Sequence, residues 1–579
     1  MPNQKMENLL NLALEVTPAE RARSQELETG FDPQDQTWEL IVKYSGSLDE
    51  VRALGVTVEE MRSEYAILTV PERLIEQVSA FPQIEYIEKP KRLFFVTDRA
   101  KAASCINILQ EGPPNLTGRG VLVAVLDSGI DYFHEDFRTP EATTRIAALW
   151  DQTLNRVFTA EEINQALGTG SREQARALVP SADISGHGTA VAGIAAGGGR
   201  APGGAAYRGI AYESELLVVK LGTAREEGFP RTTELMRAVN FVVERAVELN
   251  RPLAVNISFG NTYGSHEGNS LLETFLDDIG NFGRTSIVVG SGNEGAAAGH
   301  VSGYLKMAGD ESGRRTDGNR VREELSVAPY ETGLSVQLWK SYTDQVRISL
   351  QTPSGEILGP LSERLGPLRF RYRTMQVLVY YGKPNPYSQS QEIYFDFVPD
   401  AGSYVESGIW SFLLEPQEVV LGRYDFWLPS AAILNPSTRF LRATPDTTLT
   451  IPSAAAKVIT VGAYDSTYNA YADFSGRGFT QRTYQIKPDL AAPGVGIMAP
   501  AIGGGYRSVT GTSFAAPVVT GSVALMMQWG MVDGNDAFLY GEKVKAYLHR
   551  GAKHLPGILV YPNPEVGYGA LCVRDSIPL

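Results

Sequence analysis

The stretch Gly511-Thr512-Ser513-Phe514-Ala515-Ala516-Pro517 decides how the rest of the chain is interpreted. It predicts a turn, a small hydroxyl side chain and then a helix start, because residues 518–528 are apolar and favour helix. A serine at a helix N-terminus lies near unpaired backbone N–H groups and the positive end of the helix dipole. That position suits a nucleophile whose attack creates an oxyanion. It suits an ordinary N-cap serine equally well, so the rest of the chain must decide.

Length and composition limit the possible classes of protein. The chain has 579 residues, which predicts several domains, and 43% of them are hydrophobic, enough for sizeable cores. The formal net charge of -14 argues against nucleic acid as the main partner, because binding to phosphates needs a basic surface. No window approaches the roughly 18 uninterrupted apolar residues of a membrane span, so no membrane partner is expected.

The chain contains two cysteines, Cys105 and Cys572. They cannot form a disulfide framework, and no Cys/His spacing is typical of a zinc site, so free thiols are expected. Residues 1–7 are not followed by the apolar segment of a secretory signal. The default expectation is a cytoplasmic or spore-type compartment, with export by another route left open.

The N-terminal region predicts a small α+β unit. Residues 1–30 are charged and helix-prone, and a peripheral helix or a frayed tail is expected there. Residues 37–88 follow the order strand, helix, strand, strand, helix, strand, which is a split βαβ arrangement. An extended tail follows, because residues around Pro90 disfavour helix. This arrangement is common and indicates no function by itself.

From Gly120 the pattern is that of an α/β fold. Residues 121–126 form a continuous apolar run, typical of a parallel strand buried on both faces, and the run ends at Asp127. Such folds place their chemistry at the carboxyl ends of strands. Further strands are expected at 216–220, 253–258 and 286–290, and helical patterns at 234–249 and 271–282 separate them. The expected fold is a parallel sheet with helices on both faces.

Residues 303–446 show short alternating apolar runs with no long helical pattern, which predicts an all-β insertion, a sandwich or a jelly roll. A carbohydrate-binding module is an alternative. Core packing is the better interpretation, because the tryptophans lie mostly in alternating strands: Trp339, Trp410 and Trp427. The α/β pattern resumes at 458–463, so the predicted divisions are residues 1–99, 100–302, 303–446 and 447–579.

Nucleophilic serine catalysis needs a base near the hydroxyl and an acid that orients this base. His187 lies between small residues and begins a helical pattern, and glycines beside it let other backbone approach the ring. Asp127 could orient His187, or it could be a loop carboxylate or a helix cap. Asn293 ends another apolar strand and could donate to an oxyanion, or it could be a turn residue.

The order Asp, His, Ser along the chain is that of subtilisin. Residues 124–130, 186–189 and 511–517 resemble the three signatures of the subtilases, and Asn293 matches their oxyanion donor. The resemblance covers roughly residues 103–303 and 451–569. It implies a subtilisin-like serine endopeptidase with a triad of three residues and an oxyanion hole formed by Asn293 and the Ser513 amide: Asp127, His187 and Ser513.

The resemblance also implies a prodomain and a substrate-binding strand. Residues 37–88 resemble the subtilase prodomain, and residues 89–99 its tail, which lies in the cleft until it is cut, here near residues 94–103. The partners expected are therefore a protein or peptide substrate and the chain's own prodomain. The residues expected beside the substrate are Ser258, Phe259, Gly260, Ser291 and Gly292.

The arrangement of the whole chain resembles the Csp germination proteases of spore-forming clostridia. In that group the enzyme removes the propeptide from a cortex-lytic hydrolase, and some members have lost triad residues and act without proteolysis. This chain retains all three residues, which favours an active protease. The alternative is a binding or scaffold protein whose prodomain never leaves the cleft.

One expected metal site lacks its ligands. Asp136 matches a calcium ligand of secreted subtilisins, but the loop that would complete the site, residues 197–209, contains no Asp, Asn or Glu. Calcium prefers about six to eight oxygen ligands. We therefore expect no metal site and no cofactor.

Overall fold

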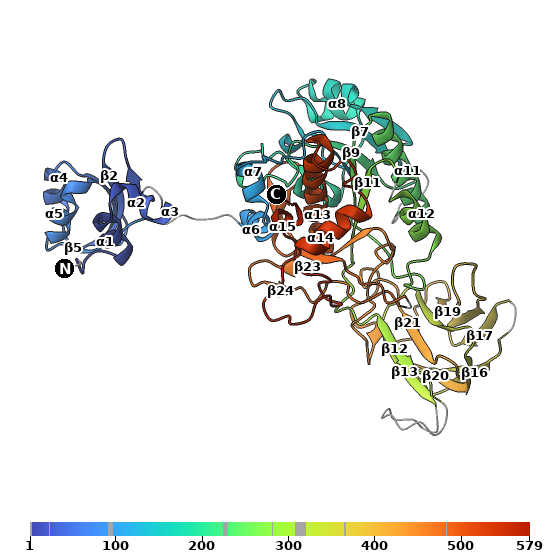
Figure 1. Cartoon of the computed structure of the whole chain (residues 1–579). Coiled ribbons are helices and arrows are strands. Elements are labelled where there is room, and N and C mark those ends of the chain that lie inside the picture. Colours follow the sequence, from blue (N-terminus) through green and yellow to red (C-terminus); the bar gives the residue numbers. More distant parts are fainter. Residues whose placement is uncertain are drawn as a thin grey trace. The chain divides into compact units, whose positions relative to one another are not determined.

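The computed structural model describes residues 3–21, 24–90, 96–223, 230–280, 282–306, 320–363, 366–481 and 483–578. The chain divides into two compact units, Met1–Phe95 and Val96–Leu579 (Figure 1). The expected tail and cut region, 89–103, falls partly on residues 91–95, which lie outside the described residues. Each unit has its own core.

The first unit is the expected α+β domain, with sheet order β1-β2-β4-β3 and β5 paired to β2. The predicted order of strands and helices is confirmed: β2 (Thr37–Tyr44), α4 (Asp49–Ala53), β3 (Thr57–Met61), β4 (Tyr65–Pro71), α5 (Ile75–Ala80) and β5 (Ile84–Glu88). Short elements complete the unit: α2 (Pro18–Arg21), α3 (Gln25–Glu28), β1 (Phe31–Asp32) and η1 (Glu72–Leu74).

The N-terminal leader is part of this unit's core, so the expectation of a peripheral or frayed segment was wrong. Its helix α1 (Asn8–Glu15) fully buries Leu10 and Ala13 against the sheet residues. Met6 adds a parallel bridge to Ile87 of β5. The leader therefore covers apolar surface that the split βαβ arrangement alone would leave exposed to water.

The second unit is built on a sheet of order β24-β23-β11-β10-β6-β9-β7-β8, with β25 paired to β23. The pairs from β23 to β7 are parallel. The predicted strands are all present: β6 (Leu122–Asp127), β9 (Glu215–Lys220), β10 (Leu253–Ile257), β11 (Thr285–Gly290) and β23 (Ile459–Asp465). Four strands that were not predicted complete the sheet: β7 (Ile146–Asp151), β8 (Arg156–Thr159), β24 (Ala470–Tyr471) and β25 (Leu490–Pro493).

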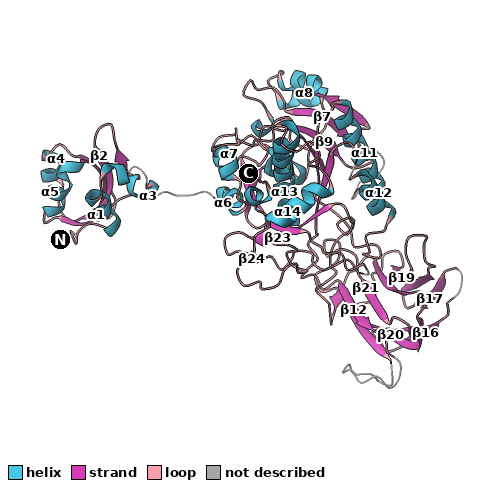
Figure 2. Ribbon diagram, in the orientation of Figure 1, coloured by secondary structure: helices cyan, strands magenta, loops and turns pink. Residues whose placement is uncertain are grey.

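Helices lie on both faces of this sheet, as predicted (Figure 2). Val123 and Val125 of β6 share a core with α10 (His187–Ala196) and α13 (Thr512–Met527). The alternate residues Leu122, Ala124 and Leu126 share a core with the opposite helices, α11 (Thr232–Glu248) and α12 (Leu271–Ile279). Because side chains alternate along a strand, Asp127 faces α10 and α13.

Further elements surround the sheet: α6 (Val96–Ala103), α7 (Asn107–Glu111), η2 (Glu135–Phe137), α8 (Ala160–Leu167), α9 (Arg172–Leu178), η3 (Gly204–Tyr207), β26 (Ile497–Pro500), β27 (Tyr506–Val509), η4 (Gln528–Val532), α14 (Glu542–Gly551) and α15 (Val573–Ser576). Helices α13 and η4 together are long and apolar enough to span a membrane, but 89% of the apolar window is buried inside the protein. This segment is therefore the central core helix of the unit.

The insertion consists of two antiparallel sheets around a common core, β12-β21-β14-β19-β18-β17 and β16-β15-β20-β13-β22. This all-β arrangement was predicted. Its strands are β12 (His300–Tyr304), β13 (Val321–Val327), β14 (Leu334–Ser341), β15 (Gln345–Gln351), β16 (Ile357–Leu361), β17 (Leu368–Tyr372), β18 (Met375–Tyr381), β19 (Ser390–Pro399), β20 (Gly408–Glu418), β21 (Arg423–Trp427) and β22 (Arg439–Phe440).

The tryptophans of the insertion are buried, as the core-packing interpretation requires. Trp410 is fully buried between the sheets, and Trp339 is 8% exposed. Trp427 stacks on His266 and His300, with ring centroids at 4.2 and 4.8 Å. Its indole N–H donates to a backbone carbonyl at 3.1 Å, so this ring helps to join the insertion to the sheet unit.

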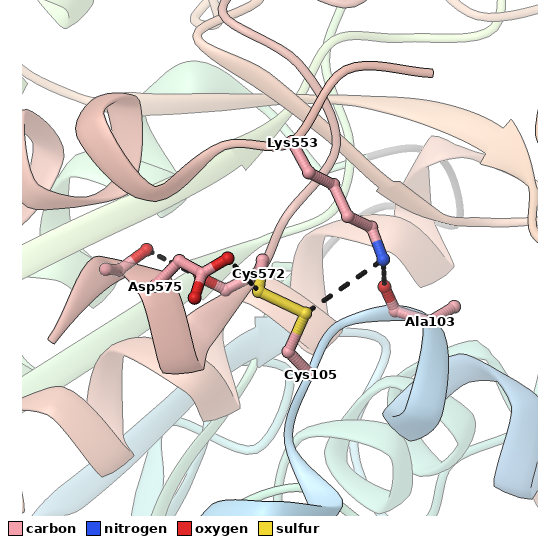
Figure 3. The surroundings of a disulfide bond; sticks show 6 residues. Ala103, Cys105, Lys553, Cys572 and Asp575 are labelled. Carbon is pink, nitrogen blue, oxygen red and sulfur yellow. Dashed lines mark hydrogen bonds between the residues drawn. A yellow bond between two sulfur atoms is a disulfide. The ribbon is translucent and has the colours of Figure 1, made fainter. Parts of the chain in front are cut away.

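A disulfide joins Cys105 to Cys572 (Figure 3), so the expectation of free thiols was wrong. The two residues are 467 positions apart, and nothing in the sequence pattern relates them. Folding places the segment after α6 beside α15: the Val573 N–H donates to the Ser104 carbonyl at 3.0 Å, and the two cysteine Cα atoms lie 4.9 Å apart. Such a Cα distance suits a disulfide.

We expect Cys105→Ala to lower the stability of the oxidised protein by about 2–4 kcal/mol, because the disulfide no longer restricts the unfolded chain. The measurement is thermal unfolding with and without dithiothreitol. The reductant should lower the melting temperature of the wild type and leave that of Cys105→Ala unchanged. An equal response of both proteins would contradict a formed disulfide.

Candidate active site

The side chains of Asp127 and His187 form a hydrogen-bonded pair. His187 Nδ1 lies 2.7 Å from Asp127 Oδ1, which also accepts the Ser128 N–H at 2.7 Å. Asp127 is the last residue of β6 and is buried, whereas His187 is the first residue of α10 and keeps a third of its side chain exposed. The pair thus places an oriented imidazole at the carboxyl edge of the sheet, open to solvent on one side.

Glycine permits this approach of α10 to β6. A Cβ atom on Gly188 would lie 2.2 Å from the Gly129 carbonyl oxygen, so a side chain there would push the helix away from the strand end. The Gly188 N–H instead donates to the Ser128 hydroxyl at 3.0 Å. The small residues beside His187 therefore set the distance between the carboxylate and the imidazole.

Asp183 holds the start of α10 and was missed in the sequence analysis. The N-cap residue Gly186 has no side chain to cap the helix, and Asp183 accepts the N–H groups of Gly186 and Thr189, both at 2.9 Å. It also accepts the Ser128 hydroxyl at 2.9 Å. The available signal was an acidic residue shortly before a helix whose N-cap is glycine.

The pKa of His187 lies above the ordinary 6.5. Burial acts to lower this pKa, but the carboxylates of Asp127 and Asp183 outweigh burial by stabilising the imidazolium. The guanidinium of Arg507, which donates to the Gly186 carbonyl at 3.0 Å, acts in the lowering direction. The charge state of this imidazole thus depends on two anions and one cation around it.

Ser513 lies in the first turn of α13, as predicted. Its hydroxyl donates to the Ser258 carbonyl at 2.8 Å, and no hydrogen bond to His187 is present among the described residues. The ring of His187 packs against the residue that follows Ser513, with its centroid 5.3 Å from that of the Phe514 ring. The serine hydroxyl therefore rests against the residue that follows β10, and the imidazole packs against the same turn of α13.

A proline inside α13 creates a second link to β10. Pro517 has no N–H, which leaves the Ser513 carbonyl without its helical donor. The Ser258 hydroxyl donates to this carbonyl at 2.9 Å. Asn256 in turn donates to the Ser258 hydroxyl at 2.7 Å and accepts from Thr520 at 2.9 Å. These buried bonds fix the serine turn to the sheet.

The amide of Asn293 has a defined orientation. Its Oδ1 atom accepts the N–H and the hydroxyl of Thr512, at 3.0 and 3.1 Å. A backbone N–H can only donate, so the oxygen of the amide faces Thr512 and the Nδ2 group is its donor end. The side chain is exposed, and the N–H of Ser513 has no partner among the described residues. Two donors are therefore available beside the serine hydroxyl.

Four other residues predicted to lie beside the substrate fall into two groups, one at a cavity and one in the loop that carries Asn293. Phe259 and Gly260 line a cavity next to the end of β10. Ser291 is fully buried, and its N–H donates to the Val461 carbonyl at 2.9 Å. The Gly292 N–H donates to the Thr512 hydroxyl at 3.2 Å. Ser291 and Gly292 thus hold the Asn293 loop, and their contact with substrate stays a prediction.

Protein groups surround the Asp136 carboxylate. Its Oδ1 atom accepts the N–H groups of Arg200 and Ala201, at 3.0 and 3.2 Å, and the Tyr506 hydroxyl at 2.7 Å. Within the described ranges, no group of three or more His, Cys, Asp and Glu side chains could hold a metal ion. Asp136 therefore ties the loop after α10 to the β26–β27 hairpin.

Comparisons with known proteins identify the family of both units of the chain. Residues 4–91 match the family model of the Csp protease B prodomain, and residues 118–337 and 435–569 match that of the subtilase family. The solved structure of the Clostridium perfringens CspB protease has 36% sequence identity and a TM-score of 0.76. The match covers 82% of this chain and 96% of that chain.

Curated relatives match over shorter segments. The membrane-bound transcription factor site-1 protease of Mus musculus is 35% identical over 129 residues, which is 21% of this chain and 12% of the relative. The serine protease AprX of Bacillus subtilis is 31% identical over 156 residues, 23% of this chain and 33% of the relative. The chain thus spans at most a third of these two relatives. Because the family model covers more than half of the chain, this protein belongs to the subtilase family of serine proteases and carries a CspB-type prodomain.

Proposed function

We propose that the chain is an active serine endopeptidase, made as a zymogen, in which Ser513 is the nucleophile, His187 the general base and Asp127 its orienting acid. The observation that carries the proposal is the 2.7 Å hydrogen bond between the buried Asp127 carboxylate and the His187 imidazole, whose ring packs on Phe514 in the helix turn that carries Ser513. A carboxylate at Nδ1 leaves the Nε2 atom of His187 as the basic nitrogen of the ring.

The proposed reaction begins when Ser513 Oγ leaves the Ser258 carbonyl and turns toward His187. It attacks the scissile carbonyl carbon while His187 Nε2 takes the hydroxyl proton, and Asp127 stabilises the imidazolium. The imidazolium then protonates the leaving amine as the C–N bond breaks. A water molecule, deprotonated by the same imidazole, hydrolyses the acyl-enzyme and restores Ser513.

We assign the two free donors to the oxyanion of this reaction. The bonds of Asn293 to Thr512 hold its amide at the residue before Ser513, and the dipole of α13 adds positive potential at this helix start. The bonds from Thr512 to Asn293 Oδ1 hold the amide in place before substrate binds. Such preorganised donors stabilise charge that develops in the transition state.

We further propose that this triad cuts the chain near residues 94–103 and that the mature enzyme processes a protein zymogen, such as a spore cortex-lytic hydrolase. The match of residues 4–91 to the Csp protease B prodomain supports both proposals. The disulfide of Cys105 favours a non-reducing compartment, so we propose the spore rather than the cytoplasm.

Ser513→Ala should leave the chain full-length, because the variant lacks the nucleophile for its own processing. The measurement is the intact mass of the purified wild type and the variant side by side. Ser508→Ala, an exposed serine on β27, is the matched control and should be processed like the wild type. A fluorophosphonate should label the wild type and Ser508→Ala only. If both wild type and Ser513→Ala remained whole and unlabelled, the scaffold alternative would take precedence.

Asn293→Ala should lower kcat by about 10²–10³-fold with little change in KM, a magnitude established for the corresponding amide of subtilisin. Asn293→Asp separates donation from positioning, because it retains an oxygen for Thr512 but has no N–H to donate. Both variants should therefore lose turnover on a peptide substrate. An unchanged kcat in either variant would exclude this amide from the reaction.

The acidic limb of the pH–activity profile should report the pKa of His187, because the protonated imidazole cannot act as a base. Arg507→Gln removes the cation that lowers this pKa, so the limb should move to higher pH. Arg507→Lys keeps the charge and should keep the wild-type limb. The profiles of kcat/KM should be measured for all three proteins, and identical limbs would refute the electrostatic role of Arg507.

A further inference from the structure

A polar cavity of about 260 Å³ lies beside the candidate active site. Its walls come from the segment after β6, from helix α9, from the segment before α10 and from the turn between β26 and β27, which carries Ile502. A Cβ atom on Gly186, the residue before His187, would lie 3.4 Å from the Ile502 side chain. The wall formed by Ile502 therefore lies against the backbone that carries the imidazole.

Two arginines of α9 line this cavity. Arg172 and Arg176 are four residues apart, so they lie on the same face of the helix. Both guanidinium charges act on the hydroxyl of Tyr132, another lining residue: burial raises the pKa of Tyr132 to about 12, whereas Arg176 and Arg172 act in the lowering direction. Both cations are therefore near enough to the cavity wall to act on a charge there.

The two arginines differ in their partners. Arg172 donates to both carboxylate oxygens of Asp131 at 3.2 Å, and its guanidinium lies over the Phe133 ring at 4.7 Å. The other carboxylate of the cavity, Asp183, uses its two oxygens for N–H groups at the start of α10, both at 2.9 Å. Arg176 is exposed and has no ion pair or side-chain hydrogen bond among the described residues. Of the two cations, Arg176 is thus the one without a carboxylate partner.

A third arginine continues the positive region toward His187. Arg507 is exposed, donates to the Gly186 carbonyl at 3.0 Å and has no carboxylate partner within the described ranges. Carboxylates outnumber cationic side chains in this chain, whose formal net charge is -14. Two arginines that nevertheless lack a carboxylate, both beside the segment that leads to His187, therefore indicate a position for an external anion.

A carboxylate on an apolar stem fits this cavity best. Phe133 and Ile502 provide apolar walls, and the Arg176 guanidinium provides a planar fork of N–H donors that matches a carboxylate. A cationic side chain would be repelled by both arginines of α9. An apolar side chain would cover the Arg176 guanidinium without offering it an acceptor, which costs free energy.

We propose that this cavity is a specificity site that takes an acidic side chain, Asp or Glu, of the peptide substrate, with Arg176 as its partner. The proposal rests on the proposed endopeptidase function and adds a substrate preference to it. Arg176 contacts the substrate in this proposal but takes no part in breaking the peptide bond.

The test compares glutamate with its uncharged isostere glutamine in otherwise identical substrates of the purified wild type. Fluorogenic decapeptides of alanine, serine and phenylalanine carry one glutamate, or one glutamine, at successive positions, and kcat/KM is measured for each. We expect one position at which glutamate exceeds glutamine by about fivefold or more, the effect of one ion pair. Because Arg176 is open to solvent, this preference should weaken as the NaCl concentration rises.

Variants of the arginine connect the preference to the cavity. Arg176→Gln should abolish the preference for glutamate, and Arg176→Glu should reverse it, because like charges repel. Arg176→Lys keeps the charge but loses the fork of donors, so it should retain part of the preference. Arg550→Gln is the matched control, an exposed arginine of α14 that is not a lining residue, and it should keep the wild-type preference.

The outcomes separate this proposal from the proposed function. Fluorophosphonate labelling reports whether Ser513 is a nucleophile in each protein. If the labelled wild type cuts the peptides without a preference for glutamate at any position, or if Arg176→Gln keeps the preference, the specificity proposal is overturned while the protease remains. If the wild type is not labelled or cuts none of the peptides, their binding by fluorescence anisotropy decides: the same preference and the same loss in Arg176→Gln support the site, and their absence overturns it.

Discussion

The site depends on the backbone N–H and carbonyl groups at the start of α13 that have no hydrogen-bond partner within the helix. A helix leaves its first N–H groups without partners, and Pro517 leaves the Ser513 carbonyl without its donor as well. The Asn293 side chain accepts a hydrogen bond from the Thr512 N–H, and the Ser258 hydroxyl donates one to the Ser513 carbonyl. Each partner ends or follows a different parallel strand, so satisfying the helix start brings the loops after β10 and β11 to the serine. The Ser513 N–H keeps no partner among the described residues.

The sheet and its motif residues were predictable because their signals are local. A strand buried on both faces must be apolar throughout, and β6 begins within one residue of its predicted start and ends at Asp127. The helix at His187 likewise begins where the pattern places it. Glycine is informative where backbones touch, as at Gly188, because no other residue fits there. The structural role of such residues can therefore be inferred from the local sequence alone.

The features that prediction missed depend on residues far apart in the chain. Cys105 and Cys572 become neighbours only after α15 reaches the segment behind α6. The burial of Leu10 requires the sheet that is formed by residues after it. Asp183 is a cap for a helix that begins four residues later, and its role is visible only when the backbone donors are in place. In each case the local sequence is compatible with several partners, and tertiary packing selects one.

The insertion and Asn293, the proposed oxyanion donor, are coupled through one short loop. Asn293 is held by Thr512 on α13, and its neighbour Glu294 is held by Ser430 of the insertion. Glu294 is nearly buried, so losing its partners would leave a charge without compensation, and the loop would have to move to rehydrate it. Any such movement would displace the Asn293 amide, because the two residues share a peptide bond. The insertion therefore supports the geometry of the site.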